Sequence, residues 1–477
     1  MILDQDPPNP LPRGPWAEPG RAEHDMSTAD SPKASTTTSP AELLRQRLAD
    51  RTATIGVVGM GYVGMPLAHA MLEAGFPVLG FDVDERKISK LDTGEIYLPH
   101  LGEAMHTDLA GSERFAATCD AARLEAADVI ILCVPTPLGP HREPDLNFVL
   151  ESTRMAAGIL RPGQLVVLES TTYPGTTRNE MQPILEQTGL ACGRDFFLAY
   201  SPEREDPGRK GVTTKAIPKL VGGVDDTSTD LAMLLYAAAV EDAHQVSSAE
   251  IAESAKILEN VYRAVNIALV NELKLILEKM DIDIWEVVEA AATKPFGFQA
   301  FYPGPGLGGH CIPIDPFYLA WKARELGHTT RFIELAGEIN SQMPAHVVTK
   351  VAEALNTIGR PIRGSKVLVL GIAYKPDVED VRESPAATII ELLLQQGAEV
   401  AYHDPHCPHF PEMRQHDIDL NSVTLDEATL AASDCVLIVT DHSNVDYSLV
   451  GRSAALVVDT RNAMADVADP VATIIKA

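Results

Sequence analysis

Residues 54–64 read TIGVVGMGYVG, and this stretch decides the fold. The apolar run 54–58 predicts a short buried strand, and the apolar spacing of residues 65–73 predicts a helix that starts directly after it. Between them lie Gly59, Gly61 and Gly64 in the pattern G-x-G-x-x-G. The pattern alone is a weak signal, but one that follows a strand and opens a helix is typical of a dinucleotide-binding Rossmann turn.

Each of the three positions in this loop needs glycine for a different reason. Gly59 turns the chain, Gly61 lets the backbone reach a pyrophosphate at the helix N-terminus, and Gly64 lets helix pack on strand. A second predicted strand, residues 78–81, ends in Asp82, whose carboxylate would bind ribose hydroxyls and repel a 2′-phosphate. We therefore expect NAD rather than NADP; the alternative is a glycine turn without a ligand. Further candidate cofactor-binding residues close by are Tyr62, Val63 and Lys87.

Polar residues follow each of the next predicted strands, which cover residues 129–134, 165–168 and 196–200. The first is followed by Thr136, the second by Ser170 and Thr171, and the third by Glu203. Because the carboxyl ends of parallel strands meet at one edge of a sheet, these side chains are expected to converge on one pocket. The alternative is ordinary turn and cap chemistry, which uses the same residue types.

Residues 249–280 predict one long helix. Its apolar residues recur every three or four positions and form a stripe: Ile251, Ala255, Leu258, Tyr262, Val265, Leu269, Leu273, Ile276 and Met280. A helix of this length spans ~50 Å, so we expect it to bridge domains and to pack against a second subunit. Lys256 and Asn260 lie one turn apart on another face, either as site residues or as a solvated polar face.

A cysteine and a carboxylate stand four residues apart in the stretch 306–316, which reads GLGGHCIPIDP. Gly308 and its neighbours remove side chains from the approach to Cys311, so a bulky substrate could reach the thiol. As a thiolate, Cys311 could attack a carbonyl, with Asp315 as its polar partner. The alternative is a buried structural cysteine.

A second α/β unit follows. Residues 366–371 predict a strand, 385–396 a helix and 398–404 another strand ending in Asp404, with further strands at 435–439 and 456–458. Its first loop, 371–376, carries one glycine and Lys375, which suits a nucleotide phosphate held by an ammonium. We expect an α/β protein with two Rossmann-like doubly wound domains joined by a long central helix.

The expected domains are a disordered leader at 1–45, an NAD-binding domain at 46–245, a central helical dimerisation domain with the cysteine loop at 246–345, and a second Rossmann-like, nucleotide-binding domain at 346–477. The leader is rich in Pro, Ser, Thr and Ala without an apolar period, and Met26 within it could be the native start. We expect no function there.

Composition narrows the class of protein. The formal net charge of −28 makes nucleic acid or an anionic membrane an unfavourable partner. The six cysteines show no C-x-x-C pairing, which fits a reducing cytoplasm, and no run is apolar enough for a membrane span or an export signal. Metal ligands are not expected.

With these residues in hand, the chain resembles the UDP-glucose/GDP-mannose dehydrogenase family over about residues 52–470, and looks closest to its UDP-N-acetylglucosamine 6-dehydrogenases. Besides the glycine loop, the resemblance rests on these stretches: VPTP at 134–137, EST at 169–171, SPE at 201–203, KILEN at 256–260, GGHCIPID at 308–315, and YKP at 374–376 with DVRES at 380–384. His310 and the run KPFGF at 294–298 resemble the N-acetylhexosamine branch.

The resemblance implies an activity: NAD-dependent four-electron oxidation of the C6 alcohol of a UDP-sugar, through a thiohemiacetal and a thioester on Cys311, for polysaccharide or O-antigen and capsule synthesis. Lys256 and Asn260 would stabilise the oxyanion, Asp315 and Thr171 would hold or activate water, and Glu203 would be the general base.

The resemblance also implies binding roles and a homodimer or higher oligomer formed through the central helix. Thr136, Ser170 and Arg382 would contact the cofactor, and the segment from Lys294 to Cys311, with Tyr302 and Gly308, would contribute to the sugar pocket beside Lys375. Where the UDP-glucose enzymes carry a further glutamate, this chain has Asp206-Pro207.

Other functions stay open at this point. UDP-glucose, UDP-N-acetylmannosamine or GDP-mannose could be the substrate. A two-electron hydroxyacid dehydrogenase also combines a Rossmann domain with a lysine and an asparagine on a long helix, but it would not need Cys311. A non-catalytic nucleotide sensor is the third class.

Overall fold

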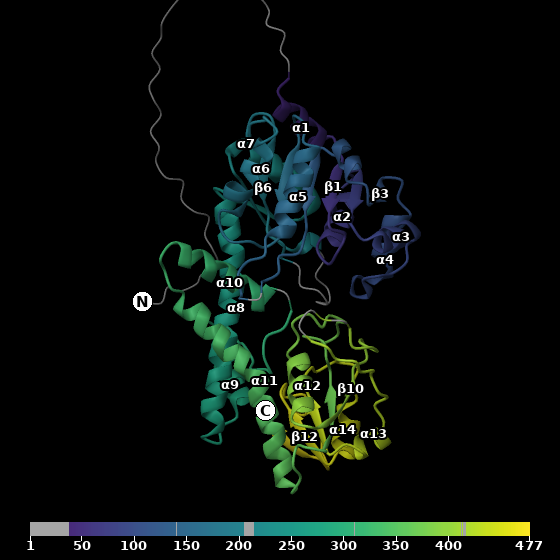
Figure 1. Ribbon diagram of the computed structural model, residues 1–477, viewed down its shortest axis with the longest axis vertical. Helices are drawn as coiled ribbons and strands as arrows, with labels where there is room; N and C mark the ends of the chain where they lie inside the picture. The colour runs from purple at the N-terminus through teal and green to yellow at the C-terminus, as the bar shows by residue number, and fades with distance from the viewer. Residues whose placement is uncertain (1–37, 140, 205–213, 310, 412, 414–415) are drawn as a thin grey trace, which may run out of the picture.

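The computed structural model describes residues 38–139, 141–204, 214–309, 311–411, 413 and 416–477. Within these residues the chain forms two α/β lobes, and the long helix α8 (Ala249–Glu278) runs alongside both of them (Figure 1). The upper lobe in Figure 1 is built from the first half of the chain and the lower lobe from residues after about 360. The predicted architecture of two Rossmann-like domains joined by a central helix is confirmed.

The N-terminal lobe contains an eight-stranded sheet of the order β3-β2-β1-β4-β5-β6-β7-β8. All neighbours pair in parallel except β6 and β7, which are antiparallel. The strand order reverses between β1 and β4, so the crevice for a ligand opens between the loops that follow these two strands. The strands are β1 (Ile55–Val58), β2 (Val78–Phe81), β3 (Phe115–Thr118), β4 (Val129–Leu132), β5 (Leu165–Leu168), β6 (Phe197–Tyr200), β7 (Lys219–Gly223) and β8 (Ala243–Gln245).

Helices cover both faces of this sheet and bury its alternate apolar side chains in two separate clusters. The α-helices are α1 (Pro40–Ala49), α2 (Gly64–Glu73), α3 (Glu85–Thr93), α4 (Gly102–Ala110), α5 (Asn147–Gly158), α6 (Gln182–Glu186) and α7 (Asp226–Ala239). The shorter turns are η1 (Pro99–Leu101), η2 (Ala121–Ala126), the π-helical η3 (Thr177–Met181) and η4 (Thr214–Ala216).

Helix α1 corrects the expected leader, which we drew as disordered up to residue 45. Ser39 caps the helix, and the Glu42 carboxylate accepts from the Ser39 backbone N–H in return, so the first turn is closed by a capping box. Leu44 and Leu48 are buried against the N-terminal core. The composition of residues 1–37 still sets them apart, but they and Met26 lie outside the described residues.

Helix α8 has the predicted length, but its apolar face is largely exposed and its polar face is buried. Most of the apolar stripe is exposed, for example Leu258 at 68% and Leu269 at 49%. The polar residues on the opposite face are buried, with Lys256 at 3% and Asn260 at 0%. The alternative of a solvated polar face is therefore wrong for these two residues, and most of the apolar stripe is exposed.

Three further helices pack around α8: α9 (Ile284–Ala292), α10 (Cys311–Glu325) and α11 (Arg331–Thr357). Helix α10 begins at Cys311; Pro313 falls in its first turn, where a missing N–H costs nothing, and the helix continues through Pro316. Asp315 therefore lies on a helix and not in a loop. Helix α11 also continues through Pro344 and across the expected domain limit at 345, so that limit stays a prediction.

The C-terminal lobe contains a five-stranded parallel sheet of the order β10-β9-β11-β12-β13, which includes an edge strand that the sequence pattern did not predict. Its order reverses between β9 and β11. The elements are β9 (Lys366–Leu370), α12 (Pro385–Gln395), β10 (Glu399–His403), α13 (Glu427–Ala431), β11 (Cys435–Ile438), α14 (Tyr447–Ser453), β12 (Leu456–Asp459) and β13 (Thr473–Lys476).

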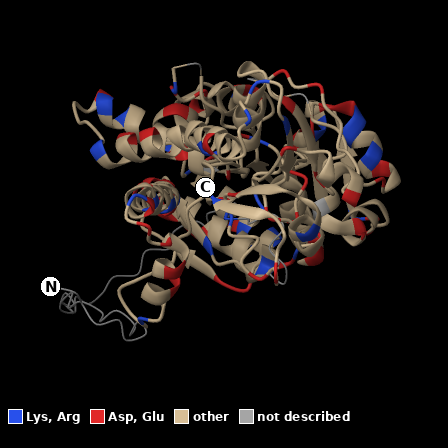
Figure 2. Ribbon diagram, turned by 90° about the horizontal axis from the view of Figure 1, so that it is seen from below, with Lys and Arg blue, Asp and Glu red and all other residues tan. Residues whose placement is uncertain are grey.

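Acidic residues occur along many of the helices and loops of the ribbon, with basic residues interspersed (Figure 2). Among the described residues, none of the helices is both long enough and apolar enough to cross a bilayer.

Candidate active site

The glycine loop after β1 has the shape of a pyrophosphate cradle. Gly59 has a φ of +95°, and a Cβ there would lie 2.3 Å from the Cys133 carbonyl oxygen. A Cβ on Gly64 would lie 1.9 Å from the Gly59 carbonyl oxygen, so helix α2 needs glycine to begin here. A Cβ on Gly61 would meet no atom within 4 Å. The open side at Gly61 fits a cofactor phosphate at the start of α2, whose N-cap is Val63.

Asp82 lies at the end of β2 and is 6% exposed. Its carboxylate accepts from the backbone N–H of Met60 at 2.9 Å, which ties the strand end to the glycine loop. The Lys87 ammonium donates to the same carboxylate at 2.9 Å. Asp82 and Lys87 therefore lie together beside the loop, where a ribose would bind to the carboxylate.

The strand-end residues come from neighbouring strands, because β4, β5 and β6 are adjacent in the sheet. Thr136, Thr171 and Glu203 are all at most 8% exposed. Ser170 is used differently, since its hydroxyl accepts from the Val134 N–H at 2.9 Å and donates to the Val134 carbonyl oxygen at 2.7 Å. It fastens the end of β5 to that of β4.

Lys256 reaches from α8 to the end of β6. Its ammonium donates to the Glu203 carbonyl oxygen at 2.5 Å and to the Glu203 carboxylate at 3.2 Å. Both side chains are nearly buried, so the charge of each is balanced by the other in a site with little water. The contact links the helix that carries Lys256 to the strand end that carries Glu203.

Asn260, one turn further along α8, holds Asp315. Its amide donates to the Asp315 carboxylate at 2.5 Å, and the Arg263 guanidinium donates to the Asn260 oxygen. Burial raises the pKa of Asp315 to about 7, while Lys256 and the Asn260 hydrogen bond act in the opposite direction. A carboxyl that titrates near neutrality suits a group that accepts and returns a proton.

Helix α10 carries Asp315 to this place through contacts with the N-terminal lobe. Tyr318, one turn on, is fully buried, and its hydroxyl donates to the Pro137 carbonyl oxygen at 3.0 Å. Ile314 and Tyr318 pack with Ile257 of α8 and with Tyr173 after β5. The first turn of α10 is thus fixed between α8 and the strand ends. Residue 311 occupies its first position; the Cys311 side chain, His310 and Asp206-Pro207 lie outside the described residues.

The two lobes meet at the glycine-rich segment before α10. The Gly309 N–H donates to the Arg382 carbonyl oxygen at 2.9 Å, and a Cβ on Gly308 would lie 2.5 Å from the Tyr374 Cβ. The Arg382 guanidinium lies over the Tyr62 ring, 4.3 Å from its centroid, and also pairs with Asp380. Arg382 therefore reaches from the C-terminal lobe to the glycine loop of the first lobe.

The segment between α9 and α10 is tied to α8 and α9. Tyr302 stacks on Trp285, with centroids 5.5 Å apart, and the Gly304 N–H donates to the Asn271 oxygen at 3.0 Å. Arg461, which sequence reasoning missed, follows β12, and its Nη1 would lie 2.8 Å from a Cβ on Gly304. The sequence contained a signal for this residue, because Arg461 is a charged residue that shortly follows a buried strand. Glu203 likewise shortly follows β6.

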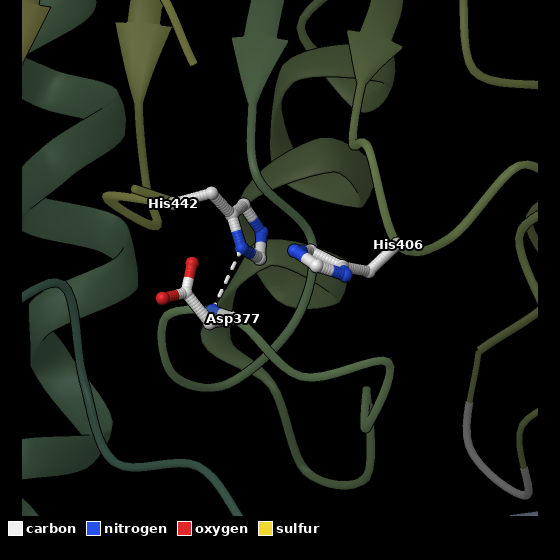
Figure 3. A group of neighbouring side chains, drawn as sticks. All are labelled: Asp377, His406 and His442. Carbon is white, nitrogen blue, oxygen red and sulfur yellow. Dashed lines mark hydrogen bonds between the residues drawn. The ribbon is translucent and has the colours of Figure 1, made fainter. Parts of the chain in front are cut away.

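The C-terminal sheet has its own ligand edge, where Lys375 follows β9 and its ammonium lies 5.6 Å from the centre of the Tyr374 ring. The Asp404 carboxylate takes the place that Asp82 has in the first lobe, accepting from the Ile372 N–H at 2.7 Å. Asp377, His406 and His442 lie together here (Figure 3). His442 already uses both ring nitrogens, on the Asp377 N–H and on Asp404, so this group does not have the free donor set of a metal site.

Comparisons with known proteins match three parts of one family in order along the chain. The NAD-binding domain of the UDP-glucose/GDP-mannose dehydrogenase family matches residues 53–240, its central domain 250–342 and its UDP-binding domain 368–466. The chain is 36% identical to Protein CapL of Staphylococcus aureus, over 85% of this chain and 95% of CapL.

Two further relatives differ in the sugar that their names give. The UDP-N-acetyl-D-glucosamine 6-dehydrogenase of Pseudomonas aeruginosa is 35% identical over 76% of this chain and 85% of its own length. The solved UDP-D-ManNAc dehydrogenase of Pyrococcus horikoshii superposes with a TM-score of 0.80 at 31% identity, covering 89% of this chain and 98% of that one.

Proposed function

The chain belongs to the UDP-glucose/GDP-mannose dehydrogenase family and is therefore an NAD-dependent oxidoreductase acting on a nucleotide sugar, and we propose that its substrate is UDP-N-acetylglucosamine. The proposed reaction is the four-electron oxidation of the C6 alcohol to the carboxylate through Cys311. The observation that supports it best is the buried contact of Asn260 with Asp315 beside the Lys256–Glu203 pair, next to the first turn of α10.

In the first half of the proposed reaction, the protein holds the sugar aldehyde and the oxyanion formed from it. NAD, held by the Gly59–Gly64 loop and Asp82, would accept a hydride from C6 in each of the two oxidations. Attack by the Cys311 thiolate on the aldehyde carbon forms a C–S bond and places negative charge on oxygen. The Lys256 ammonium and the Asn260 amide are the donors for that charge, each contributing about 3 kcal/mol where such donors are preorganised.

Residue 311 is the first position of α10, where the helix dipole favours negative charge. This position supports a thiolate in the proposed attack. After the second oxidation the sugar is bound as a thioester, which water must cleave. The aldehyde never needs to leave the enzyme.

In the second half the enzyme hydrolyses the thioester. A water oxygen attacks the carbonyl carbon, a C–O bond forms, the C–S bond breaks, and one water proton moves to a carboxylate of the site. Glu203 is the proposed general base, and Asp315 with Thr171 would hold or activate the water. The raised pKa of Asp315, about 7, allows it to take up and release a proton near neutral pH.

The nucleotide would be held by the C-terminal lobe. Lys375 follows β9 at the reversal of strand order, where an ammonium can bind a diphosphate. Arg461 lies beside Gly304 and would add a second cation at the sugar segment. Tyr302 and Gly308 come from the same segment. We assign the substrate contacts to these residues.

The choice of N-acetylglucosamine rests on the run KPFGF at 294–298 and on the relative from Pseudomonas aeruginosa. The name of the Pyrococcus structure favours UDP-N-acetylmannosamine as the second candidate. UDP-glucose and GDP-mannose are the remaining candidates. We further propose that the uronate serves polysaccharide, O-antigen or capsule synthesis in the cytoplasm.

We also propose a homodimer, or a higher oligomer built from it, through the exposed stripe of α8. Surface apolar residues normally occur singly, whereas these form a continuous stripe along one helix. Such a stripe is suited to packing against the same helix of a second copy. The exposed residues of the stripe are Ile251, Leu258, Tyr262, Leu269, Leu273, Ile276 and Met280.

The test is an NAD-reduction assay with four nucleotide sugars at equal concentration: UDP-N-acetylglucosamine, UDP-N-acetylmannosamine, UDP-glucose and GDP-mannose. The highest kcat/KM is expected with UDP-N-acetylglucosamine. A higher value with UDP-N-acetylmannosamine would reassign the sugar and leave the chemistry standing. Absence of NAD reduction with all four would contradict the proposed function.

A further inference from the structure

A buried charged group lies beneath the strand ends of the active site. Glu169 directly follows β5 and is 0% exposed, and Lys219, the first residue of β7, is 5% exposed. The Lys219 ammonium donates to one oxygen of the Glu169 carboxylate, and the Tyr236 hydroxyl from α7 donates to the other at 2.5 Å. Each carboxylate oxygen thus has its own donor.

This group holds the chain on both sides of the bond between Pro202 and Glu203. The Lys219 ammonium also donates to the Pro202 carbonyl oxygen at 3.2 Å. The Glu203 N–H donates to the Glu169 carbonyl oxygen at 3.3 Å. Because the Glu203 carbonyl and carboxylate also accept from Lys256, Glu203 is held both by the Glu169–Lys219 pair and by α8.

Stability alone gives a poor reason for such a pair. Removing two charges from water is costly, and replacing a buried ion pair by apolar residues of similar size is often neutral or stabilising. Breaking the pair by removing one partner, in contrast, leaves an unpaired buried charge. What an apolar pair could not supply is the ammonium N–H that binds the Pro202 carbonyl oxygen.

We propose that Lys219 is a positioning residue for thioester hydrolysis: paired with Glu169, it binds the Pro202 carbonyl and so sets the place of the Glu203 carboxylate. This inference rests on the proposed function of Glu203. Lys219 does not contact the reacting atoms; water attacks the thioester carbon, the C–S bond breaks, and the water proton moves to Glu203. A displacement of about 1 Å in that carboxylate is enough to slow such a step about 100-fold.

The test compares Lys219→Met/Glu169→Leu with the wild type, so that no single buried charge is left unpaired. We expect kcat to fall about 10- to 100-fold, with KM for NAD and for the UDP-sugar changed less than about threefold. The two hydride transfers are spared, so acid-quenched enzyme is expected to carry a covalent nucleotide-sugar adduct in the steady state, visible by intact-protein mass spectrometry. Lys215→Met removes a partly exposed lysine close by in the chain, which pairs with Glu73, and is the matched control, with wild-type kcat and little adduct.

Tyr236→Phe is a second variant that removes one hydroxyl from Glu169 and keeps the ion pair and the fold. It is expected to show the same adduct with a smaller loss of kcat, about 3- to 10-fold. Wild-type kcat in both variants would overturn the proposal, and so would a loss of kcat without adduct. Failure of the proposed function is distinguishable, because the wild type would then produce no uronate.

Discussion

The Asn260 amide donates to the Asp315 carboxylate at 2.5 Å, and these side chains are 0% and 1% exposed. The bond joins the middle of α8 to the second turn of α10, which begins with Cys311. It places a proton-accepting group beside the position from which the covalent chemistry is proposed to start.

Asp315→Asn is expected to lower kcat about 100-fold or more, because the amide cannot accept a proton. Burial raises the pKa of Asp315 to about 7, so the ionised base is depleted below that pH and kcat of the wild type should rise as pH rises through 7. This rise of kcat with pH should disappear in Asp315→Asn. Glu325→Gln, at the exposed end of the same helix, should keep it. If Asp315→Asn kept both the wild-type kcat and its rise with pH, Asp315 would be excluded from the reaction.

Gly61→Val tests the cofactor cradle. A Cβ at Gly61 meets no atom of the protein within 4 Å, so the thermal unfolding midpoint should not change. The valine would occupy the space assigned to the pyrophosphate, and KM for NAD should rise at least about tenfold, a loss of about 1.4 kcal/mol of binding free energy. Gly158→Val, at an equally open position in α5, is the control. Equal KM values for NAD in the two variants would show that the pyrophosphate does not bind at Gly61.

Lys274→Met is expected to stabilise the protein. Lys274 is 4% exposed, lines a cavity of about 220 Å³ with Trp285, and within the described residues its ammonium has no hydrogen-bond partner. Burial lowers its pKa from 10.5 to about 8. The penalty for burying the charge is therefore fully present below pH 8 and is relieved as pH rises to about 10.5.

The measurement is the free energy of unfolding in urea for the wild type, Lys274→Met and the exposed control Lys279→Met. At pH 7 we expect an increase of about 1 to 3 kcal/mol for Lys274→Met alone. The increase should shrink between pH 8 and 10. A loss of stability at pH 7 would mean that the ammonium has a stabilising partner.

Leu269→Glu addresses the proposed dimer. Leu269 is 49% exposed in the middle of the α8 stripe, and a buried glutamate at an interface would be uncompensated. Light scattering after size exclusion should give the mass of a monomer for the variant and of a dimer or higher oligomer for the wild type. Leu335→Glu, similarly exposed on α11, should leave the mass unchanged. An unaltered mass for Leu269→Glu would place the interface elsewhere.

Much of the fold could be predicted because its signals are local. The glycine loop, Asp82 and the strand-end residues each follow a buried apolar run, and parallel pairing then places them at one edge. The same reasoning found Asp404 but was not applied to Arg461, which follows β12.

Other features depend on tertiary contacts that a pattern does not contain. An apolar stripe identifies a helix but not what covers it, so periodicity could not show that α8 buries Lys256 and Asn260 and exposes Leu258. Pro313 and Pro316 hide the start of α10 from a sequence pattern, because proline usually ends a helix, although a proline in the first turn is tolerated. The Glu169–Lys219 pair joins residues fifty positions apart, and no local spacing announces it.

The central claim is that one enzyme performs both oxidations of C6 without releasing the aldehyde. The most direct measurement is the amount of NADH formed per UDP-sugar consumed, with limiting UDP-N-acetylglucosamine and excess NAD, for the wild type and for Cys311→Ser. Two NADH per sugar in the wild type, with no full conversion to the acid in Cys311→Ser, are the predicted result. One NADH per sugar in the wild type, or undiminished conversion to the uronate by Cys311→Ser, would contradict it.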